Sequence, residues 1–241
     1  MNTTILLTAC IDPKGMAFTA LQNKEVRLQQ YLNALNYYLH NTNLNIVFVE
    51  NTGYDISDKY KQFINNKRLE VITFQGNDYD KQLGKGYGEA LIIKYALKHS
   101  ILLQQTSNII KITGRLIISN INALVKQCKT KNCVYCNLVK ATSRKNTSYS
   151  IFFFAPREFF KNYLIKNIEK INDFKKYYFE HYLNDCCIQW KKDGFSWKEF
   201  FLPIIILGQS GTHGVYYKFS YIMYIKQFIR YIAHRIGVYR I

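Results

Sequence analysis

Acidic residues are scarce in this sequence of 241 residues, which has 16 Asp and Glu against 33 Lys and Arg. The formal net charge of +17 predicts a positive field that attracts phosphate groups on nucleotides, nucleic acid or anionic lipid headgroups. Charge alone does not choose among these partners. A disordered chain is excluded, because hydrophobic residues make up 48% and aromatic residues 16% of the sequence.

The first apolar run has no basic segment before it. Residues 3–11 are followed directly by Asp12, a pattern typical of a buried first strand and not of a signal peptide. We therefore expect a cytoplasmic protein. The chain also lacks internal repeats and low-complexity linkers, and its length suits one sizeable core.

The six cysteines lack the partners that a metal site needs. Cys133 and Cys136 form a Cys-x-x-Cys pair, yet they lie in an alternating, strand-like segment. Neither a second such pair nor a nearby His completes a zinc site. We expect reduced thiols and no zinc.

Apolar strand-like runs alternate with helical patterns along the first half of the chain. Strands are predicted at 4–10, 45–50, 69–74 and 107–114, and helices at 25–40, near 55–65 and at 88–103. Right-handed crossovers between such units predict a mostly parallel α/β sheet with helices on both faces.

The pattern changes in the second half. Strand candidates at 132–139 and 147–155 form a hairpin or an antiparallel edge, which would make the sheet mixed. Helices with aromatic stripes are predicted at 157–170 and 174–190.

The last segment, residues 215–241, is helical in composition and has no acidic residue. Its cations are Lys218, Lys226, Arg230, Arg235 and Arg240. They interrupt the apolar residues too often for a membrane-spanning helix. We expect a basic aromatic helix that either lies on an anionic membrane surface or packs on the protein's own core.

Residues directly after the predicted strands are the candidate ligand contacts, because ligands of open α/β sheets bind beyond the carboxyl ends of the strands. Asp12 and Glu50 are carboxylates that suit hydrogen bonds from a ribose or a base, although each also suits an ordinary turn. The backbone of Thr8, Ala9 and Cys10 would then lie beside a base. These and Asn51 are the candidates from the first two strands.

A glycine-rich segment precedes the third predicted helix. Gly84, Gly86 and Gly88 would let backbone N–H groups approach a ligand, with Lys85 supplying charge and Glu89 in the first helical turn. The spacing matches neither an ATP-binding P-loop nor the dinucleotide fingerprint.

Gly114 and Arg115 end the fourth predicted strand. The Arg115 guanidinium suits a diphosphate, and no acidic residue stands next to it to hold a divalent metal. Fixed cations are therefore favoured over Mn²⁺ or Mg²⁺ for stabilising a leaving diphosphate, with Asp78 and Asp80 as the remaining candidate metal ligands.

The strand-end acids, the segment Lys85–Ala90 and the segment Lys111–Arg115 resemble bacterial surface-polysaccharide glycosyltransferases of GT-A-like fold, those of lipopolysaccharide or capsule synthesis, whose usual DXD motif is replaced by an (S/T)GR-type sequence. The resemblance covers the first half of the chain. It implies a single Rossmann-like domain at 1–214, with a donor half at about 1–118 and an acceptor half at about 119–214, followed by the tail at 215–241. It also implies a nucleotide-sugar donor and a glycan or lipid-linked acceptor.

A transferase that inverts configuration needs a base for the acceptor hydroxyl. Glu180 and Asp185 are the candidates in the acceptor half, and only one of them is expected to face the site. A polar loop at 208–214 suits a lid that brings His213 to a phosphate.

Two other readings stay open. A basic protein rich in Tyr and Phe suits nucleic-acid binding, yet no recognition motif is present and we expect no nucleic-acid partner. A nucleotidyltransferase of the same fold class would need carboxylates that bind a metal near Arg115. We favour a metal-independent glycosyltransferase, peripheral at the inner face of the cytoplasmic membrane.

Overall fold

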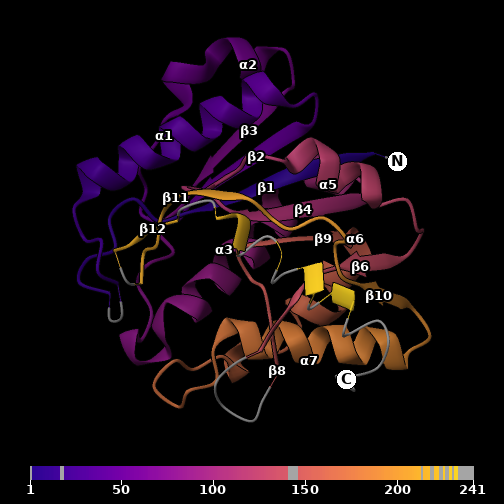
Figure 1. Cartoon of the computed structure of the whole chain (residues 1–241). Helices are drawn as coiled ribbons and strands as arrows, with labels where there is room; N and C mark the ends of the chain where they lie inside the picture. Colours follow the sequence, from indigo (N-terminus) through magenta and orange to yellow (C-terminus); the bar gives the residue numbers. More distant parts are fainter. Residues whose placement is uncertain are drawn as a thin grey trace.

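Seven strands form the central sheet of the computed structural model (Figure 1). In spatial order they are β10 (Ser196–Lys198), β6 (Cys133–Tyr135), β9 (Phe152–Pro156), β4 (Asn108–Thr113), β1 (Thr3–Ala9), β2 (Asn45–Glu50) and β3 (Leu69–Thr73). Only β9 runs antiparallel to its neighbours. The structure describes residues 2–16, 19–140, 146–212, 214–217, 220–222, 225, 228–229 and 231–232.

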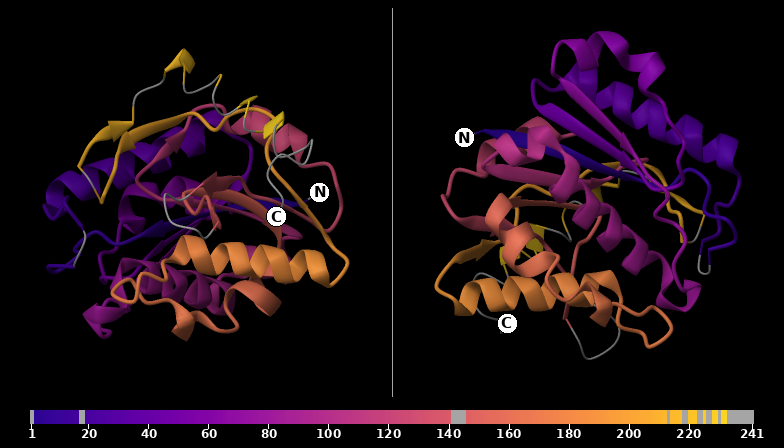
Figure 2. Two further views of the ribbon diagram at one scale, coloured as in Figure 1. Left: turned by 60° about the horizontal axis from the view of Figure 1, so that its bottom comes forward. Right: turned by 180° about the vertical axis from the view of Figure 1, so that it is seen from behind.

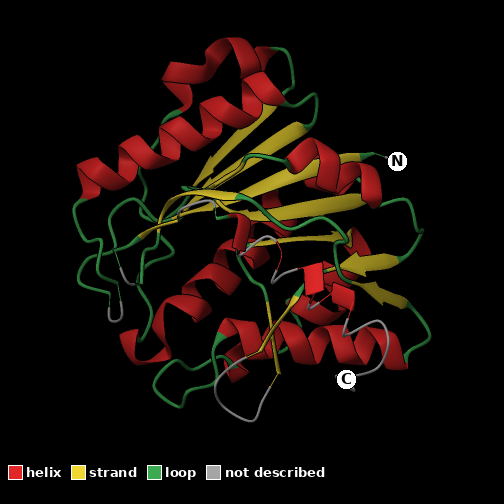
Figure 3. Cartoon of the chain, viewed as in Figure 1, coloured by secondary structure: helices red, strands yellow, loops and turns green. Residues whose placement is uncertain are grey.

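Helices cover both faces of this sheet (Figures 2 and 3). One face carries α1 (Lys24–Asn41), α2 (Lys61–Asn65) and α5 (Ile121–Gln127), and the other carries α3 (Gly84–His99), α4 (Ile101–Gln105), α6 (Arg157–Phe159) and α7 (Phe179–Lys192). The predicted mixed α/β sheet with helices on both faces is confirmed.

Short elements complete the chain. They include the 3₁₀ helices η1 (Ser57–Tyr60), η2 (Lys81–Leu83) and η4 (Ile168–Lys170) and the π-helix η3 (Phe160–Leu164). A three-stranded sheet is formed by β5 (Ile117–Ile118), β11 (Ile206–Gln209) and β12 (Tyr216–Tyr217), and a two-stranded sheet by β7 (Leu138–Lys140) and β8 (Asn146–Ser148).

The strands form because their side chains are buried on both faces. All seven residues of β1 are buried, which is typical of a parallel strand between two layers of helices. Leu6 belongs to the core on the α3 side, and Leu7 belongs to the core on the α1 side. The long hydrophobic runs of the sequence are therefore explained by strands that are buried on both faces.

The strand order reverses at β1. From β1 the chain adds β2 and then β3 on one side, and it returns to place β4 on the other side. Thr8 of β1 is directly paired with Thr113 of β4, so these two threonines mark the carboxyl ends at the reversal. Open α/β sheets bind ligands at such a switch point.

Several predicted helices differ from the structure. The helix predicted at 88–103 is divided at Ser100 into α3 and α4. The segment 157–170 is divided into α6, η3 and η4, because the neighbouring Phe159 and Phe160 both pack into the core and the chain turns more widely there. The helix predicted from residue 174 begins at Phe179, after a turn closed by the Asn172–Tyr177 bridge. The tail begins with β12, which pairs with β11, and the described residues beyond 220 are helical.

No helix within the described ranges is long and apolar enough to span a bilayer.

Candidate functional site

A cavity of about 340 Å³ lies at the carboxyl ends of β1 and β4, at the point where the strand order reverses. Its wall combines residues of β1, β4, α3 and the start of α7 with the loop after β11. The predicted site residues that line it are Thr8, Ala9, Cys10, Asn51, Lys85, Gly86, Gly88, Glu89, Arg115 and Glu180. Residues far apart in the sequence thus meet in one cavity.

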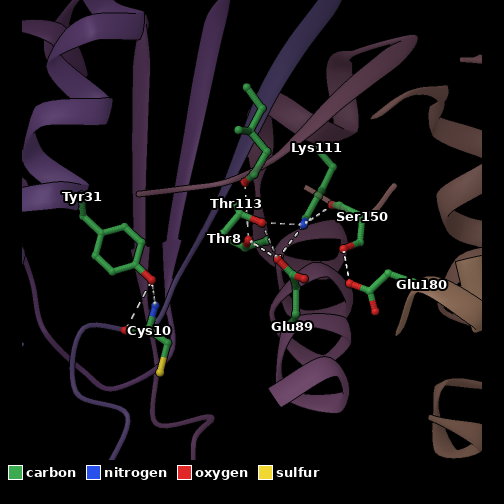
Figure 4. Close-up of polar contacts among 9 residues, drawn as sticks. Thr8, Cys10, Tyr31, Glu89, Lys111, Thr113, Ser150 and Glu180 are labelled. Carbon is green, nitrogen blue, oxygen red and sulfur yellow. Dashed lines mark hydrogen bonds and ion pairs between the residues drawn. The ribbon is translucent and has the colours of Figure 1, made fainter. Parts of the chain in front are cut away.

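Glu89, on the second turn of α3, lines the cavity. Its carboxylate lies beside Thr8, Lys111 and Thr113 (Figure 4). Its Oε1 accepts a hydrogen bond from Thr8 Oγ1 at 2.8 Å and lies 2.5 Å from Lys111 Nζ. Thr113 Oγ1 is a longer donor to the same oxygen, at 3.4 Å. The two strand-end threonines and the lysine of β4 therefore fix this carboxylate in place.

Glu180, on the first turn of α7, also lines the cavity and lies beside Ser150 (Figure 4). Its Oε1 accepts a hydrogen bond from Ser150 Oγ at 2.6 Å. Ser150 itself lines the cavity just before β9. The cavity therefore holds carboxylates from both halves of the chain.

Lys85 and Arg115 are two of the three cations that line the cavity among the described residues. Lys85 Nζ donates to Thr212 Oγ1, and an Arg115 nitrogen donates to the Gln209 carbonyl. Burial lowers the pKa of both Lys85 and Arg115, and Glu180, Asp173 and Glu89 act on Lys85 in the opposite direction. An anion bound in the cavity would offset part of the free-energy cost of burying these two charges.

The segment after β1 contributes the uncharged residues Cys10, Pro13 and Met16 to the cavity wall, and Arg27 of α1 lies beside Cys10. The Arg27 guanidinium donates to the Cys10 carbonyl from both Nε, at 2.9 Å, and Nη2, at 2.5 Å. Burial raises the pKa of the Cys10 thiol to about 11, so it is not a thiolate at neutral pH.

Asn51, just after β2, lines the cavity with a buried polar side chain. It is 1% exposed, and its Oδ1 has no hydrogen-bond partner among the described residues. A buried amide without partners costs free energy unless a ligand or water satisfies it.

Five predicted residues are placed elsewhere. Glu50 is fully buried, and its two oxygens accept from the backbone of Ile11, Thr52 and Tyr54, so they fix the loops after β1 and β2. Asp12 accepts a hydrogen bond from the Lys14 amide in a turn, and the Gly114 amide donates to the Thr8 carbonyl. Asp185 is exposed and accepts a hydrogen bond from Tyr177. His213 lies outside the described residues.

The glycine-rich segment is part of α3 and not a loop ahead of it. A Cβ on Gly86 would stand 3.1 Å from Asp173 Oδ1, and a Cβ on Gly88 would stand 2.2 Å from Tyr79 Oη. The glycines are therefore explained by close packing of Asp173 and Tyr79 against the helix, as well as by their place in the cavity wall.

Asp173 is the main residue that sequence reasoning missed. It lines the cavity, it is 4% exposed, and its Oδ2 accepts from the Gly86 amide at 3.4 Å. Burial raises the pKa of its carboxyl group. No local signal marks Asp173, because its contacts on α3 lie 87 residues away in the sequence.

No group of three or more His, Cys, Asp or Glu side chains in the described part of the chain is placed to hold a metal ion.

Comparisons with known proteins find similarity only among solved structures. No protein-family model and no curated protein matches the chain. An inositol-1-phosphate CTP transferase from T. maritima is 14% identical, with a TM-score of 0.47 over 83% of this chain and 85% of that one. A cytidylyltransferase from Leptospira borgpetersenii is 12% identical, with a TM-score of 0.43 over 83% and 76%. Core-mannan synthase A from Aspergillus fumigatus, in a form with Mn and GDP, is 8% identical, with a TM-score of 0.45 over 92% and 82%.

Proposed function

We propose that the chain is a glycosyltransferase that moves a sugar from a nucleoside diphosphate sugar to a hydroxyl of a glycan or lipid-linked acceptor. The observation that carries this proposal is that Lys85 and Arg115 line one cavity together with Glu89 and Glu180. Such a cavity combines fixed cations for a diphosphate with carboxylates for sugar hydroxyl groups.

Each group has a role in this reaction. Lys85 and Arg115 stabilise the negative charge that develops on the diphosphate as the bond to the sugar breaks. Glu180 accepts the proton of the acceptor hydroxyl, because it faces the cavity from the acceptor half. Asn51 and the backbone of residues 8–10 contact the nucleoside.

Nucleotidyl transfer is the alternative reaction for the same cavity. It joins a nucleoside monophosphate to a phosphate and releases pyrophosphate, whereas glycosyl transfer releases a nucleoside diphosphate. Product analysis therefore separates the two reactions without knowledge of the natural acceptor.

The deciding experiment is a thermal-shift panel of UDP, GDP, CMP and dTDP sugars and of the four nucleoside triphosphates, with Mn²⁺, Mg²⁺ or EDTA. A ligand at about 100 times its Kd adds about 2.7 kcal/mol, which is about 5–10 °C in Tm for a chain of this size. We expect at least one nucleotide sugar to stabilise the wild type and Lys98→Gln, whose exposed lysine lies at the far end of α3, but not Arg115→Gln. Stabilisation by triphosphates with release of pyrophosphate would favour nucleotidyl transfer, and no stabilisation by any nucleotide would contradict both.

The tail supports a membrane-bound acceptor. Ile225 and Ile229 are 56% and 59% exposed, while Phe228 and Tyr231 contact Phe201 with their rings at 5.4 Å. Aliphatic side chains that stay in water while their neighbours pack on the protein suit the interface of an anionic bilayer. We propose that this segment holds the enzyme peripherally at the inner face of the cytoplasmic membrane.

A further inference from the structure

Lys111 is a charged residue in the middle of the central sheet. It lies on β4 between β1 and β9, paired with Leu6 and Phe153, and its side chain is 0% exposed. A buried ammonium is costly unless its hydrogen bonds are satisfied. The predictions from sequence gave Lys111 no role.

The ammonium of Lys111 has three oxygen partners for its three N–H groups. They are Glu89 Oε1 at 2.5 Å, the Ser150 carbonyl at 2.7 Å and Thr113 Oγ1 at 3.3 Å. The Phe179 ring lies on another side, with its centroid 5.8 Å from Nζ. Lys111 is therefore fully coordinated, and it has no direct part in ligand binding.

The contacts of Lys111 decide which oxygen of Glu89 faces the ligand. Lys111, Thr8 and Thr113 all bind Oε1, so that Oε2 lies outside these three contacts (Figure 4). Because Glu89 lines the cavity, Oε2 is the oxygen left for a ligand there. A carboxylate with one oxygen fixed by three donors presents the other oxygen as a preorganised hydrogen-bond acceptor.

We infer that Lys111 is a positioning residue, which holds Glu89 so that Oε2 accepts a hydrogen bond from a hydroxyl group of the bound nucleotide sugar. This inference rests on the proposed function and deepens it. Ligands that lack the hydroxyl would leave Oε2 unpaired in a partly buried site, which is the strongest kind of discrimination a polar pocket offers.

The test measures binding of the nucleotide sugar that raises the Tm most, by isothermal titration calorimetry on folded protein. We expect Glu89→Gln to weaken binding about 10- to 100-fold, as loss of a charged hydrogen bond does. Lys111→Met is expected to weaken it by a similar factor. In the double variant Lys111→Met/Glu89→Gln the affinity should equal that of Glu89→Gln alone, because Lys111 acts through Glu89.

The matched control is Lys94→Met, on the exposed face of the same helix as Glu89, which should bind like the wild type. If Lys111→Met does not fold, Lys111→Gln serves in its place, because its amide keeps a donor for Glu89 without the charge. A purely structural lysine would change Tm and leave affinity unchanged, and that result overturns the inference alone. Failure of the wild type to bind any nucleotide sugar overturns the proposed function and this inference with it.

Discussion

The Asp173 carboxylate lies against Gly84 at the start of α3, so that a Cβ on Gly84 would stand 2.3 Å from Asp173 Oδ2. Gly84 also has a φ of +82° with a ψ of 179°, a backbone conformation that is essentially restricted to glycine. Two independent constraints therefore require glycine where the chain enters the helix that carries Lys85 and Glu89.

Gly84→Ala is expected to destabilise the protein by more than the ~1 kcal/mol that a left-handed φ alone costs an alanine. Gly194→Ala is the control for a positive φ without a contact, because Gly194 has a φ of +89° and no atom within 4 Å of its added Cβ. Urea unfolding of both variants measures the difference. Equal losses would mean that the contact with Asp173 has no energetic weight.

The glycines of α3 show where prediction from sequence ends. Lys85, Gly86 and Gly88 of the run 84–88 line the cavity, and their position after a strand and before a helical pattern made them candidates from the sequence. The assignment of this run to a loop was wrong, since the helix begins at Gly84. Asp173 and Tyr79 pack closely against the glycines in the first two turns of α3, and no local sequence pattern reveals such neighbours. The sheet, in contrast, was predictable because runs buried on both faces are visible in the sequence itself.

Asp173→Asn should change the pH dependence of stability. Burial raises the pKa of Asp173 above its ordinary value of 3.8, although the Gly86 amide and Lys85 lower it. An acid whose pKa is raised in the folded state makes its full contribution to the stability of the fold at pH values below its ordinary pKa. That contribution is lost as the pH rises through the pKa of the folded state. We therefore expect Asp173→Asn to have a higher Tm than the wild type at pH 7, with an advantage that shrinks toward pH 4.

Differential scanning fluorimetry from pH 4 to pH 8 follows that difference. Asp78→Asn, at an exposed position on the loop before α3, is the control and should show a flat difference. An Asp173→Asn protein that loses stability at every pH would show that its carboxylate is needed as a cap for α3.

Glu50→Ala is expected to destabilise the fold without removing a ligand contact. Its oxygens accept four hydrogen bonds, from the Ile11, Thr52 and Tyr54 amides and from the Thr52 hydroxyl, at 2.5–2.9 Å. Loss of a buried carboxylate with this many donors costs on the order of 3 kcal/mol, or about 6–12 °C in Tm.

Thermal unfolding of Glu50→Ala beside Glu25→Ala, an exposed glutamate on α1, checks this expectation. The sequence placed Glu50 correctly at the end of a strand. It does not show that the following loop folds back over both carboxylate oxygens. A stable Glu50→Ala protein with weakened nucleotide binding would contradict this expectation and would show that Glu50 contacts the ligand.

Membrane contact through the tail predicts that Ile225→Ser/Ile229→Ser weakens binding to anionic vesicles about tenfold or more, because two exposed aliphatic side chains no longer enter the bilayer. Co-sedimentation with vesicles of phosphatidylglycerol and phosphatidylcholine measures the partition. Val26→Ser, at a 43% exposed valine on α1, is the control that should bind as the wild type does. Undiminished binding of the double variant would assign the contact to the basic surface alone.

The two acids considered as the catalytic base differ in position. Glu180 faces the cavity and accepts from Ser150, whereas Asp185, five residues later on α7, is exposed and bonded to Tyr177.

Removing a general base lowers turnover by about 10²- to 10⁴-fold. Glu180→Gln should therefore lose this much kcat while it keeps its affinity for the nucleotide sugar. Asp185→Asn, the same kind of change on the same helix, should stay close to the wild type. Release of the nucleoside diphosphate in single-turnover reactions measures both. Equal losses in the two variants would contradict the assignment, because only Glu180 is within reach of a ligand in the cavity.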